Sequence, residues 1–374
     1  MSPARLVAVV AEGRPGFVEA LSRAWDAGDA VFPLDPRLPA PAAEAALDAM
    51  GPAVVVDDAR EVHGRGGGRP VEDGDALVVA TSGTTGAPRG VVLTHGAVAA
   101  AAHATSAALA VDPTADRWLA CLPVAHVGGL SVVTRALITG TPLSILPRFD
   151  AAAVMAEARD GATLVSLVAT ALARIDASVF RRVLVGGSAL PAPLPDNVVA
   201  TYGLTETGGG VVYGGTPLPG VEVREVAGEL QVRSPTLLRC YRDGTDPRGD
   251  GGWLATGDAG WVAGDGVVHV LGRLAEVIVT GGEKVWPALV EAVLGRHPGV
   301  AEVSVAGRPD PEWGQRVVAF VVAVDPASPP TLEALRAWAK EQLPAYAAPR
   351  EVAVVDRLTR TAIGKVRRDQ LGRR

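Results

Sequence analysis

The sequence predicts an α/β protein with a large N-terminal domain of doubly wound, mostly parallel sheets and a small α+β domain at the C-terminus. Up to residue 200, short apolar runs alternate with segments of helical spacing, the pattern of parallel sheets covered by helices. From residue 221 short strands and turns take over, which indicates a small β subdomain. A compact α+β unit follows Gly272, Arg273 and Leu274, so we divide the chain into residues 1–272 and 273–374.

The N-terminal elements follow from periodicity and from residues that favour helix starts. Phe17, Ala20, Leu21 and Ala24 recur at helical spacing, and Pro41 suits the first turn of a second helix. The apolar runs between such segments predict buried strands. The expected helices are residues 16–25, 41–50, 97–111, 130–139 and 151–159; the expected strands are residues 7–10, 30–32, 53–56, 76–80, 91–93, 118–122, 142–145, 164–167, 182–185 and 198–200.

The remaining elements are shorter. The expected strands of the β subdomain are residues 229–232, 260–262 and 267–271. In the C-terminal unit we expect helices at residues 287–296 and 332–343 and strands at residues 300–306 and 316–322. Thr331 is expected to cap the last helix, because its hydroxyl can accept a hydrogen bond from a free N–H group at the helix start.

Composition narrows the classes of function. The chain has 374 residues, a net charge of −6 and two cysteines. It lacks the basic face that a nucleic acid or an anionic membrane requires, and we see neither a signal peptide nor a membrane span. Cys121 and Cys240 show no metal-ligand spacing and suit a reducing compartment. We therefore expect a cytoplasmic protein that binds small molecules, as a monomer or a homo-oligomer.

A segment of glycine and hydroxyl residues follows the apolar run 76–80. It begins with Thr81, Ser82, Gly83, Thr84, Thr85 and Gly86. Such a backbone can turn sharply and direct N–H groups and hydroxyls toward an anion, while Pro88 stiffens the far side and Arg89 adds a positive charge. The spacing matches neither a Walker A loop nor a dinucleotide fingerprint. We expect a phosphate-binding loop; the alternative is an ordinary surface loop.

A second polar segment follows the expected strand 198–200. It consists of Tyr202, Gly203, Leu204, Thr205, Glu206 and Thr207. We expect a loop at the carboxyl end of a strand, where open α/β sheets bind ligands. An aromatic ring, hydroxyl donors and one carboxylate suit a base, a phosphate and a magnesium ion, respectively. Taken alone, the segment is better explained as a turn that carries a solvated Glu206.

The order of five motifs makes the chain resemble the adenylate-forming acyl-CoA synthetase superfamily over nearly its whole length. Besides the two segments above, the motifs are Thr256-Gly257-Asp258, Gly272-Arg273 and Gly364-Lys365. The resemblance implies a large N-terminal domain and a mobile C-terminal domain. It also implies that a carboxylate attacks the α-phosphate of ATP, pyrophosphate leaves, and a thiol, usually that of CoA, attacks the acyl-adenylate. ATP, Mg²⁺ and CoA are thus the implied cofactors and co-substrates.

The resemblance also implies roles for single residues. The segment from Thr81 to Gly86 would hold the phosphates. Catalysis would depend on Thr205, Glu206 and Lys365, with Glu206 binding Mg²⁺ and Lys365 bridging the adenylate and substrate oxygens. The remaining nucleotide contacts would come from Gly187 and Ser188 beside the adenine, Tyr202 stacked on it, the adjoining Gly203, Asp258 on the ribose hydroxyls, and Arg273 supporting Asp258.

The segment from Leu122 to Arg135 bears on the acid substrate. It resembles the acyl-pocket region of the o-succinylbenzoate-CoA ligases of menaquinone biosynthesis, which read Leu-Pro-x-x-His-x-Ser/Gly-Gly with an arginine further on. His126 and Gly129 would then line the pocket, and Arg135 would face the second carboxylate of the substrate. From the residues alone, His126 is equally a core histidine and Arg135 equally a solvated helix residue.

The chain departs from the superfamily pattern in four places. Arg89 replaces a lysine, Ala275 stands at the hinge where Asp or Lys is common, and Gly128 stands where serine is frequent. Only about eighty residues precede the phosphate loop, so part of the usual N-terminal subdomain is missing.

We expect an ATP-dependent acid-CoA ligase acting on o-succinylbenzoate. The alternatives are a CoA ligase for another aryl or medium-chain acid, a stand-alone adenylation domain serving a carrier protein, and a catalytically inactive nucleotide-binding protein. The presence of both Glu206 and Lys365 argues against the last alternative.

Overall fold

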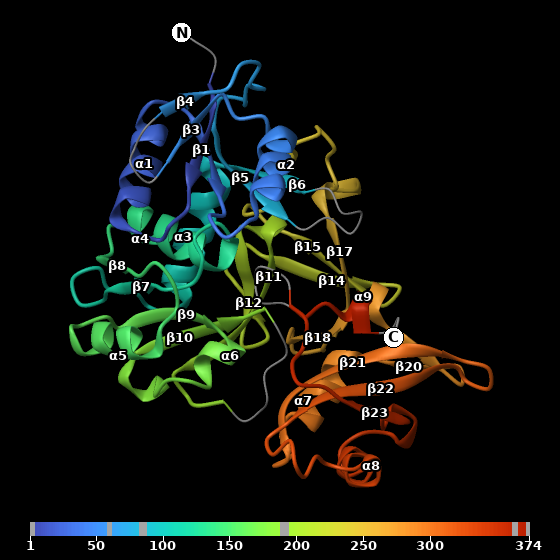
Figure 1. Cartoon of the computed structure of the whole chain (residues 1–374). Coiled ribbons are helices and arrows are strands. Elements are labelled where there is room, and N and C mark those ends of the chain that lie inside the picture. Colours follow the sequence, from blue (N-terminus) through green and yellow to red (C-terminus); the bar gives the residue numbers. More distant parts are fainter. Residues whose placement is uncertain (1–3, 58–61, 82–87, 188–193, 361–365, 372–374) are drawn as a thin grey trace.

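The computed structural model describes residues 4–57, 62–81, 88–187, 194–360 and 366–371. Within these residues it contains two seven-stranded sheets, a four-stranded sheet and a five-stranded C-terminal sheet (Figure 1). The predicted α/β class, with mostly parallel N-terminal sheets, is confirmed. In the described part of the chain, no helix is long and apolar enough to cross a bilayer.

The first sheet combines the N-terminal strands with one strand from much later in the chain. Its order is β16-β6-β5-β2-β1-β3-β4. The pairs β1–β2, β1–β3 and β2–β5 are parallel, and the outer pairs are antiparallel. The strands are β1 (Leu6–Val10), β2 (Ala30–Leu34), β3 (Val54–Val56), β4 (Val62–Gly64), β5 (Asp75–Thr81), β6 (Arg89–Thr94) and β16 (Cys240–Tyr241).

The second sheet has the order β13-β12-β11-β10-β9-β7-β8. Its central pairs are parallel, and β12 and β13 extend one edge with antiparallel pairing. The strands are β7 (Trp118–Ala120), β8 (Leu143–Ile145), β9 (Leu164–Val168), β10 (Arg182–Gly186), β11 (Val198–Leu204), β12 (Gly209–Tyr213) and β13 (Thr216–Pro217).

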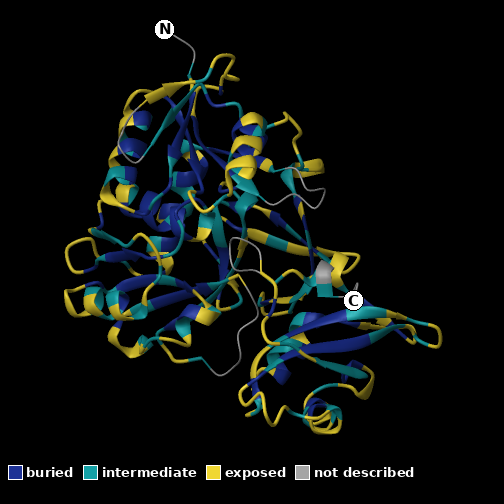
Figure 2. Cartoon of the chain, viewed as in Figure 1, coloured by how far each residue is buried: buried dark blue, intermediate teal, exposed yellow. Residues whose placement is uncertain are grey.

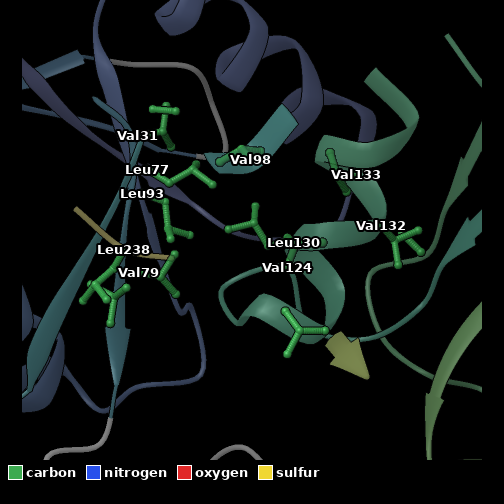
Figure 3. Packing of buried hydrophobic residues seen from close by; sticks show 14 of the residues in the cluster. Val31, Leu77, Val79, Leu93, Val98, Val124, Leu130, Val132, Val133 and Leu238 are labelled. Atoms are coloured by element: carbon green, nitrogen blue, oxygen red, sulfur yellow. The ribbon is translucent and has the colours of Figure 1, made fainter. Parts of the chain in front are cut away.

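Helices separate the two sheets and cover their outer faces. The largest hydrophobic cluster lies between the sheets, where α1 (Pro15–Asp26), α3 (His95–Ala108) and α4 (Val127–Thr139) pack (Figure 3). Helix α2 (Ala40–Met50) covers the outer face of the first sheet, and α5 (Ala151–Arg159) with α6 (Ala169–Leu172) covers that of the second. Figure 2 shows the resulting pattern of buried strands under half-exposed helices.

An antiparallel four-stranded sheet forms the expected β subdomain. Its strands are β14 (Glu222–Val226), β15 (Glu229–Arg233), β17 (Leu254–Val262) and β18 (Val268–Arg273). The predicted domain boundary after residue 272 falls at the end of β18. Short 3-10 turns occur at η1 (Ala177–Val179), η2 (Thr205–Thr207), η3 (Asp250–Gly252), η4 (Leu274–Glu276) and η5 (Ala345–Ala347).

The C-terminal residues form an α+β unit with its own hydrophobic cluster. Thr331 caps α8 as expected, since its hydroxyl accepts a 3.2 Å hydrogen bond from the Ala334 N–H group. The elements are β19 (Ile278–Thr280), β20 (Glu283–Val285), β21 (Val300–Asp310), β22 (Gly314–Ala323), β23 (Glu351–Val354), α7 (Pro287–Leu294), α8 (Leu332–Lys340) and α9 (Arg368–Leu371).

One local expectation was wrong. The segment from Tyr202 to Thr207 is not a loop throughout, because β11 continues through Leu204 and only Thr205–Thr207 turns, as η2. The antiparallel neighbour β12, which the glycine run begins, supplies the pairing that extends β11. Gly203 lies so close to this neighbour that a β-carbon would stand 2.0 Å from the carbonyl oxygen of Gly209, so only glycine fits.

Candidate active site

The predicted phosphate loop connects two antiparallel strands of the first sheet. Strand β5 ends at Thr81 and β6 begins at Arg89, and these two residues face each other across the pair. The Thr81 hydroxyl donates to the Arg89 carbonyl oxygen over 3.2 Å. The loop is therefore held at both ends by one antiparallel strand pair. Five residues of the expected loop lie outside the described residues: Ser82, Gly83, Thr84, Thr85 and Gly86.

Tyr202, Asp258 and Arg273 meet in space, although 71 residues separate the first from the last. The Tyr202 hydroxyl donates to Asp258 Oδ2 over 2.8 Å, and Arg273 Nε lies 3.1 Å from Asp258 Oδ1. Asp258 is only 5% exposed and sits opposite Arg273 in the β17–β18 register. Burial and the neighbouring carboxylate raise the pKa of Tyr202, so its hydroxyl stays a donor. This cluster is suited to bind vicinal hydroxyls, as in a ribose.

Gly187 and Ser188 were expected beside the adenine. Gly187 directly follows β10, with a left-handed φ of +88° that favours glycine. Strands β10 and β11 are parallel neighbours, so their carboxyl ends lie at the same edge of the sheet. Gly187, after β10, and Glu206, after β11, therefore both lie at that edge. Ser188 lies outside the described residues, as does Lys365.

Glu206 is held by a residue that the sequence did not single out. Tyr241, on β16, donates its hydroxyl to Glu206 Oε1 over 3.0 Å. The guanidinium carbon of Arg89 lies 3.8 Å from the centre of the Tyr241 ring. Tyr241 thus connects the far end of the phosphate segment with Glu206, which lies in η2 directly after Thr205. A two-residue strand carries no periodicity, so Tyr241 could not be recognised from the sequence.

The donor set suits a magnesium ion that arrives with ATP. Among the described residues, no group of three or more His, Cys, Asp or Glu side chains could hold a metal by itself. Mg²⁺ usually takes one or two protein carboxylates and completes its shell with phosphate oxygens and water. Glu206, with Tyr241 bonded to one of its oxygens, fits that requirement.

Arg135 is buried, so the alternative of a solvated helix residue is wrong. It is 4% exposed, and its Nε and Nη1 atoms have no hydrogen-bond partner among the described residues. Its guanidinium carbon lies 4.5 Å from the centre of the Trp118 ring, and burial lowers its pKa. The side chain borders a cavity of about 10 Å³, which holds about one water molecule. Gly208, Gly209 and Ser131 line the same cavity, so it reaches the strand that follows Glu206.

His126 and Gly129 set the start of α4. His126 is the N-cap residue, and its Nε2 atom lies 3.1 Å from Asp35 Oδ2. At Gly129 a β-carbon would stand 2.4 Å from the Leu122 carbonyl oxygen and 2.5 Å from that of Pro123. This glycine lets α4 begin directly against the preceding loop. His126 is partly exposed, with 31% of its side chain accessible, so it is not an enclosed core histidine.

Two separate stretches of the chain match known protein families. Residues 58–242 match the AMP-binding enzyme family, and residues 289–365 match the AMP-binding enzyme C-terminal domain. A protein of Mycobacterium tuberculosis named probable 2-succinylbenzoate–CoA ligase is 42% identical over 338 residues, covering 82% of this chain and 86% of that protein. The chain belongs to the AMP-binding enzyme family. The predicted resemblance to the o-succinylbenzoate-CoA ligases is confirmed.

Other AMP-binding enzymes agree with this assignment. The 2-succinylbenzoate–CoA ligase of Bacillus cytotoxicus is 35% identical, over 79% of this chain and 69% of its own. The o-succinylbenzoate CoA synthetase of Bacillus subtilis, solved with its acyl-adenylate intermediate, superposes with a TM-score of 0.86 at 28% identity, covering 99% of this chain and 88% of that one. The same enzyme has been solved with ATP and a magnesium ion.

Proposed function

We propose that this protein is an ATP-dependent, AMP-forming acid-CoA ligase that adenylates o-succinylbenzoate and transfers the acyl group to CoA, as a step of menaquinone biosynthesis. The observation that carries the substrate assignment is the buried, unpaired guanidinium of Arg135 beside the candidate site. An unpaired buried cation is costly, and a second substrate carboxylate would compensate it. The relatives named above are ligases of the same acid.

In the first half-reaction a carboxylate oxygen of the acid forms a bond to the α-phosphorus of ATP, and pyrophosphate leaves. Asp258, supported by Arg273 and Tyr202, orients the ribose, because a carboxylate is the natural acceptor for two adjacent hydroxyls. Glu206 would hold the Mg²⁺ that accompanies ATP, and that ion would reduce the negative charge on the phosphates. Lys365 stabilises the negative charge that builds up in this step.

In the second half-reaction the thiol of CoA attacks the acyl carbon, a thioester forms, and AMP leaves. The same chain must withdraw Lys365 and admit CoA, which requires a mobile C-terminal domain. Cys121 and Cys240 are free and buried, which suits the cytoplasm, where we place the enzyme.

The cavity beside Arg135 supports recognition of the second carboxylate through a water molecule. At about 10 Å³ it has room for a water molecule but not for a carboxylate. We therefore place one water between the guanidinium and the substrate. A charge-assisted hydrogen bond of this kind is worth about 1.5–3 kcal/mol, or roughly tenfold to a hundredfold in kcat/KM.

The test is a pyrophosphate-release assay on Arg135→Met over a panel of aryl and alkyl acids with one or two carboxylates. We expect kcat/KM for o-succinylbenzoate to fall about tenfold to a hundredfold, while the KM for ATP stays unchanged. Thermal stability should stay equal or rise, because methionine removes a buried unpaired charge at similar length. Arg117→Met, which removes a surface ion pair with Asp160 next to Trp118, is the matched control and should leave activity unchanged.

Two results would contradict the assignment. If Arg135→Met used o-succinylbenzoate as well as the parent does, Arg135 would not recognise the substrate. If the parent preferred a monocarboxylic acid, the protein would be a ligase for another aryl or medium-chain acid.

A further inference from the structure

A buried carboxylate lies behind His126. Asp35 directly follows β2, is 6% exposed, and accepts hydrogen bonds from the Arg37 backbone N–H, Nε and Nη2 groups over 3.0, 2.8 and 2.7 Å. Its Oδ2 atom lies 3.1 Å from His126 Nε2. Asp35 therefore faces a guanidinium on one side and an imidazole on the other.

The charge state of Asp35 fixes the proton on the imidazole. Burial raises the pKa of Asp35, but the hydrogen bonds from His126 and Arg37 outweigh burial and hold the pKa well below its ordinary value. An ionised carboxylate can only accept hydrogen bonds, so His126 Nε2 must carry the hydrogen. In the neutral imidazole, Nε2 is therefore the nitrogen that carries the hydrogen. Its Nδ1 atom is then an acceptor.

The topology places this pair at the candidate site. Strands β2 and β5 are parallel neighbours, so Asp35 leaves the sheet at the same edge as Thr81, where the phosphate segment begins. His126 caps α4, and that helix carries Arg135. The Asp35–His126 hydrogen bond thus connects the first sheet with the helix that borders the cavity.

We propose that Asp35 is a positioning residue for the acyl pocket: it fixes the ring and the tautomer of His126, which in turn bounds the site of the acid. This inference rests on the proposed function, which assigns His126 to that pocket. Asp35 acts through His126 and does not touch the substrate. The losses in kcat/KM caused by replacing Asp35 and by replacing His126 should therefore not add.

The opposite end of β2 offers a matched control. Asp29 directly precedes β2, is 5% exposed, and accepts hydrogen bonds from the Arg5 backbone N–H, Nε and Nη2 groups. Both carboxylates are buried, both accept hydrogen bonds from the backbone and the guanidinium of one arginine, and each adjoins one end of β2. They differ in that Asp35 binds His126 and lies at the edge of the sheet with the candidate site. Asp29→Ala therefore measures how much stability is lost when such a carboxylate–arginine pair is removed away from His126.

The first experiment is a double-mutant cycle with Asp35→Ala, His126→Ala and the double variant, with kcat/KM measured for o-succinylbenzoate and KM for ATP. Each single variant should lose about tenfold in kcat/KM, and the double variant also about tenfold, with the KM for ATP unchanged. Asp29→Ala should retain full activity per folded molecule. Losses that multiply to about a hundredfold, or an equal loss in Asp29→Ala, would overturn the inference. Asp35→Asn, which keeps the side-chain volume, replaces Asp35→Ala if that variant does not fold.

The second experiment separates this inference from the proposed function, because it needs no substrate. NMR of the protein with ¹⁵N-labelled histidine, with His126 assigned among the six histidines by His126→Gln, reports the ring tautomer. We expect His126 to be protonated at Nε2 in the parent and to show a mixture of tautomers in Asp35→Asn. An unchanged tautomer in Asp35→Asn would overturn the positioning role. A third outcome is also informative: Asp35→Asn changes the tautomer of His126, but His126→Ala has no effect on kcat/KM. Asp35 would then position His126, and the assignment of His126 to the acyl pocket, which belongs to the proposed function, would be wrong.

Discussion

At the scale of single residues, most candidate functional groups are held by a second polar side chain. Asp258 has Arg273, His126 has Asp35, and Glu206 has Tyr241. Each partner orients its neighbour before any ligand arrives, which lowers the cost of ordering on binding. Arg135 is different, because two of its nitrogens have no partner among the described residues. That difference is what we expect if Arg135 acquires its partner only when the substrate binds, through the bridging water that we propose.

The contact between Tyr241 and Glu206 does not change with pH near neutrality. Burial and the nearby carboxylate raise the pKa of Tyr241 to about 12, so its hydroxyl remains protonated and donates to Glu206 at any physiological pH. One oxygen of Glu206 is therefore engaged by a neutral hydrogen-bond donor.

Replacing Glu206 by glutamine should raise the magnesium requirement of adenylation. A neutral amide is a poorer ligand for a hard cation, so we expect the half-saturating Mg²⁺ concentration to rise about tenfold, equal to ~1.4 kcal/mol. Exchange of labelled pyrophosphate into ATP over a magnesium titration measures this directly. Glu222→Gln, which removes an exposed carboxylate paired with Arg233, is the control. An unchanged titration in Glu206→Gln would remove Glu206 from the metal site.

At the scale of elements, α4 carries or adjoins the residues that we propose line the acyl pocket. It is packed between the two sheets, and its start depends on a close approach to the loop before it. Gly128 and Gly129 are neighbours in the first turn of α4 but differ in the room available for a side chain. Among the described residues, a β-carbon at Gly128 would meet only Leu122 Cδ1, at 3.8 Å, whereas one at Gly129 would meet two backbone carbonyl oxygens.

This difference predicts opposite effects of two alanine substitutions. Gly129→Ala forces α4 away from the loop, and overpacking of this kind costs about 1–3 kcal/mol, or roughly 1–5 °C in Tm for a protein of this size. Gly128→Ala should leave Tm equal or raise it, because alanine favours the helix. Thermal unfolding of both variants checks this. Equal Tm values for the two variants would mean that the start of α4 is not constrained by its contact with the loop.

Much of the element order could be predicted because buried parallel strands read as short apolar runs, such as residues 164–167 and 182–185, between helical segments. Local chemistry also predicted the cap at Thr331. The two-residue strand β16 could not be predicted, because it exists only through pairing with β6, almost 150 residues earlier. For the same reason the burial of Arg135 could not be decided: it depends on α4 lying between two sheets. Asp35, a carboxylate at the end of a predicted strand, could have been recognised.

At the scale of the whole molecule, one arginine ties the C-terminal tail to the segment after the predicted boundary. Arg368 on α9 binds both carboxylate oxygens of Glu291 on α7, over 3.0 and 2.5 Å, and also pairs with Glu276 of η4. Glu291 in turn accepts from the Val305 backbone N–H group over 2.7 Å. The residues after the predicted hinge and the tail are therefore joined to one body, which should move together.

A proline at Ala275 tests whether this body rotates. Ala275 lies in η4, between the end of β18 and the start of β19. Proline would fix φ there and restrict Leu274, which opposes rotation of the chain at this point. We expect the thioester half-reaction to fall at least tenfold more than adenylation, measured separately by single-turnover assays. Equal loss in both halves would indicate a damaged site, and full activity in both would place the pivot elsewhere.

The pairing of β16 with β6 has a consequence for synthesis on the ribosome. Until residues 239–242 emerge, β6 remains an open edge with the apolar residues Val91, Val92 and Leu93, and Asp75 lacks its partner Arg239. At about 5–20 residues per second, that interval lasts roughly 7–30 s. During it the nascent first sheet exposes a template for pairing with other chains. The protein should therefore depend on chaperones most strongly in the middle of its translation, before the strand that closes this edge has been made.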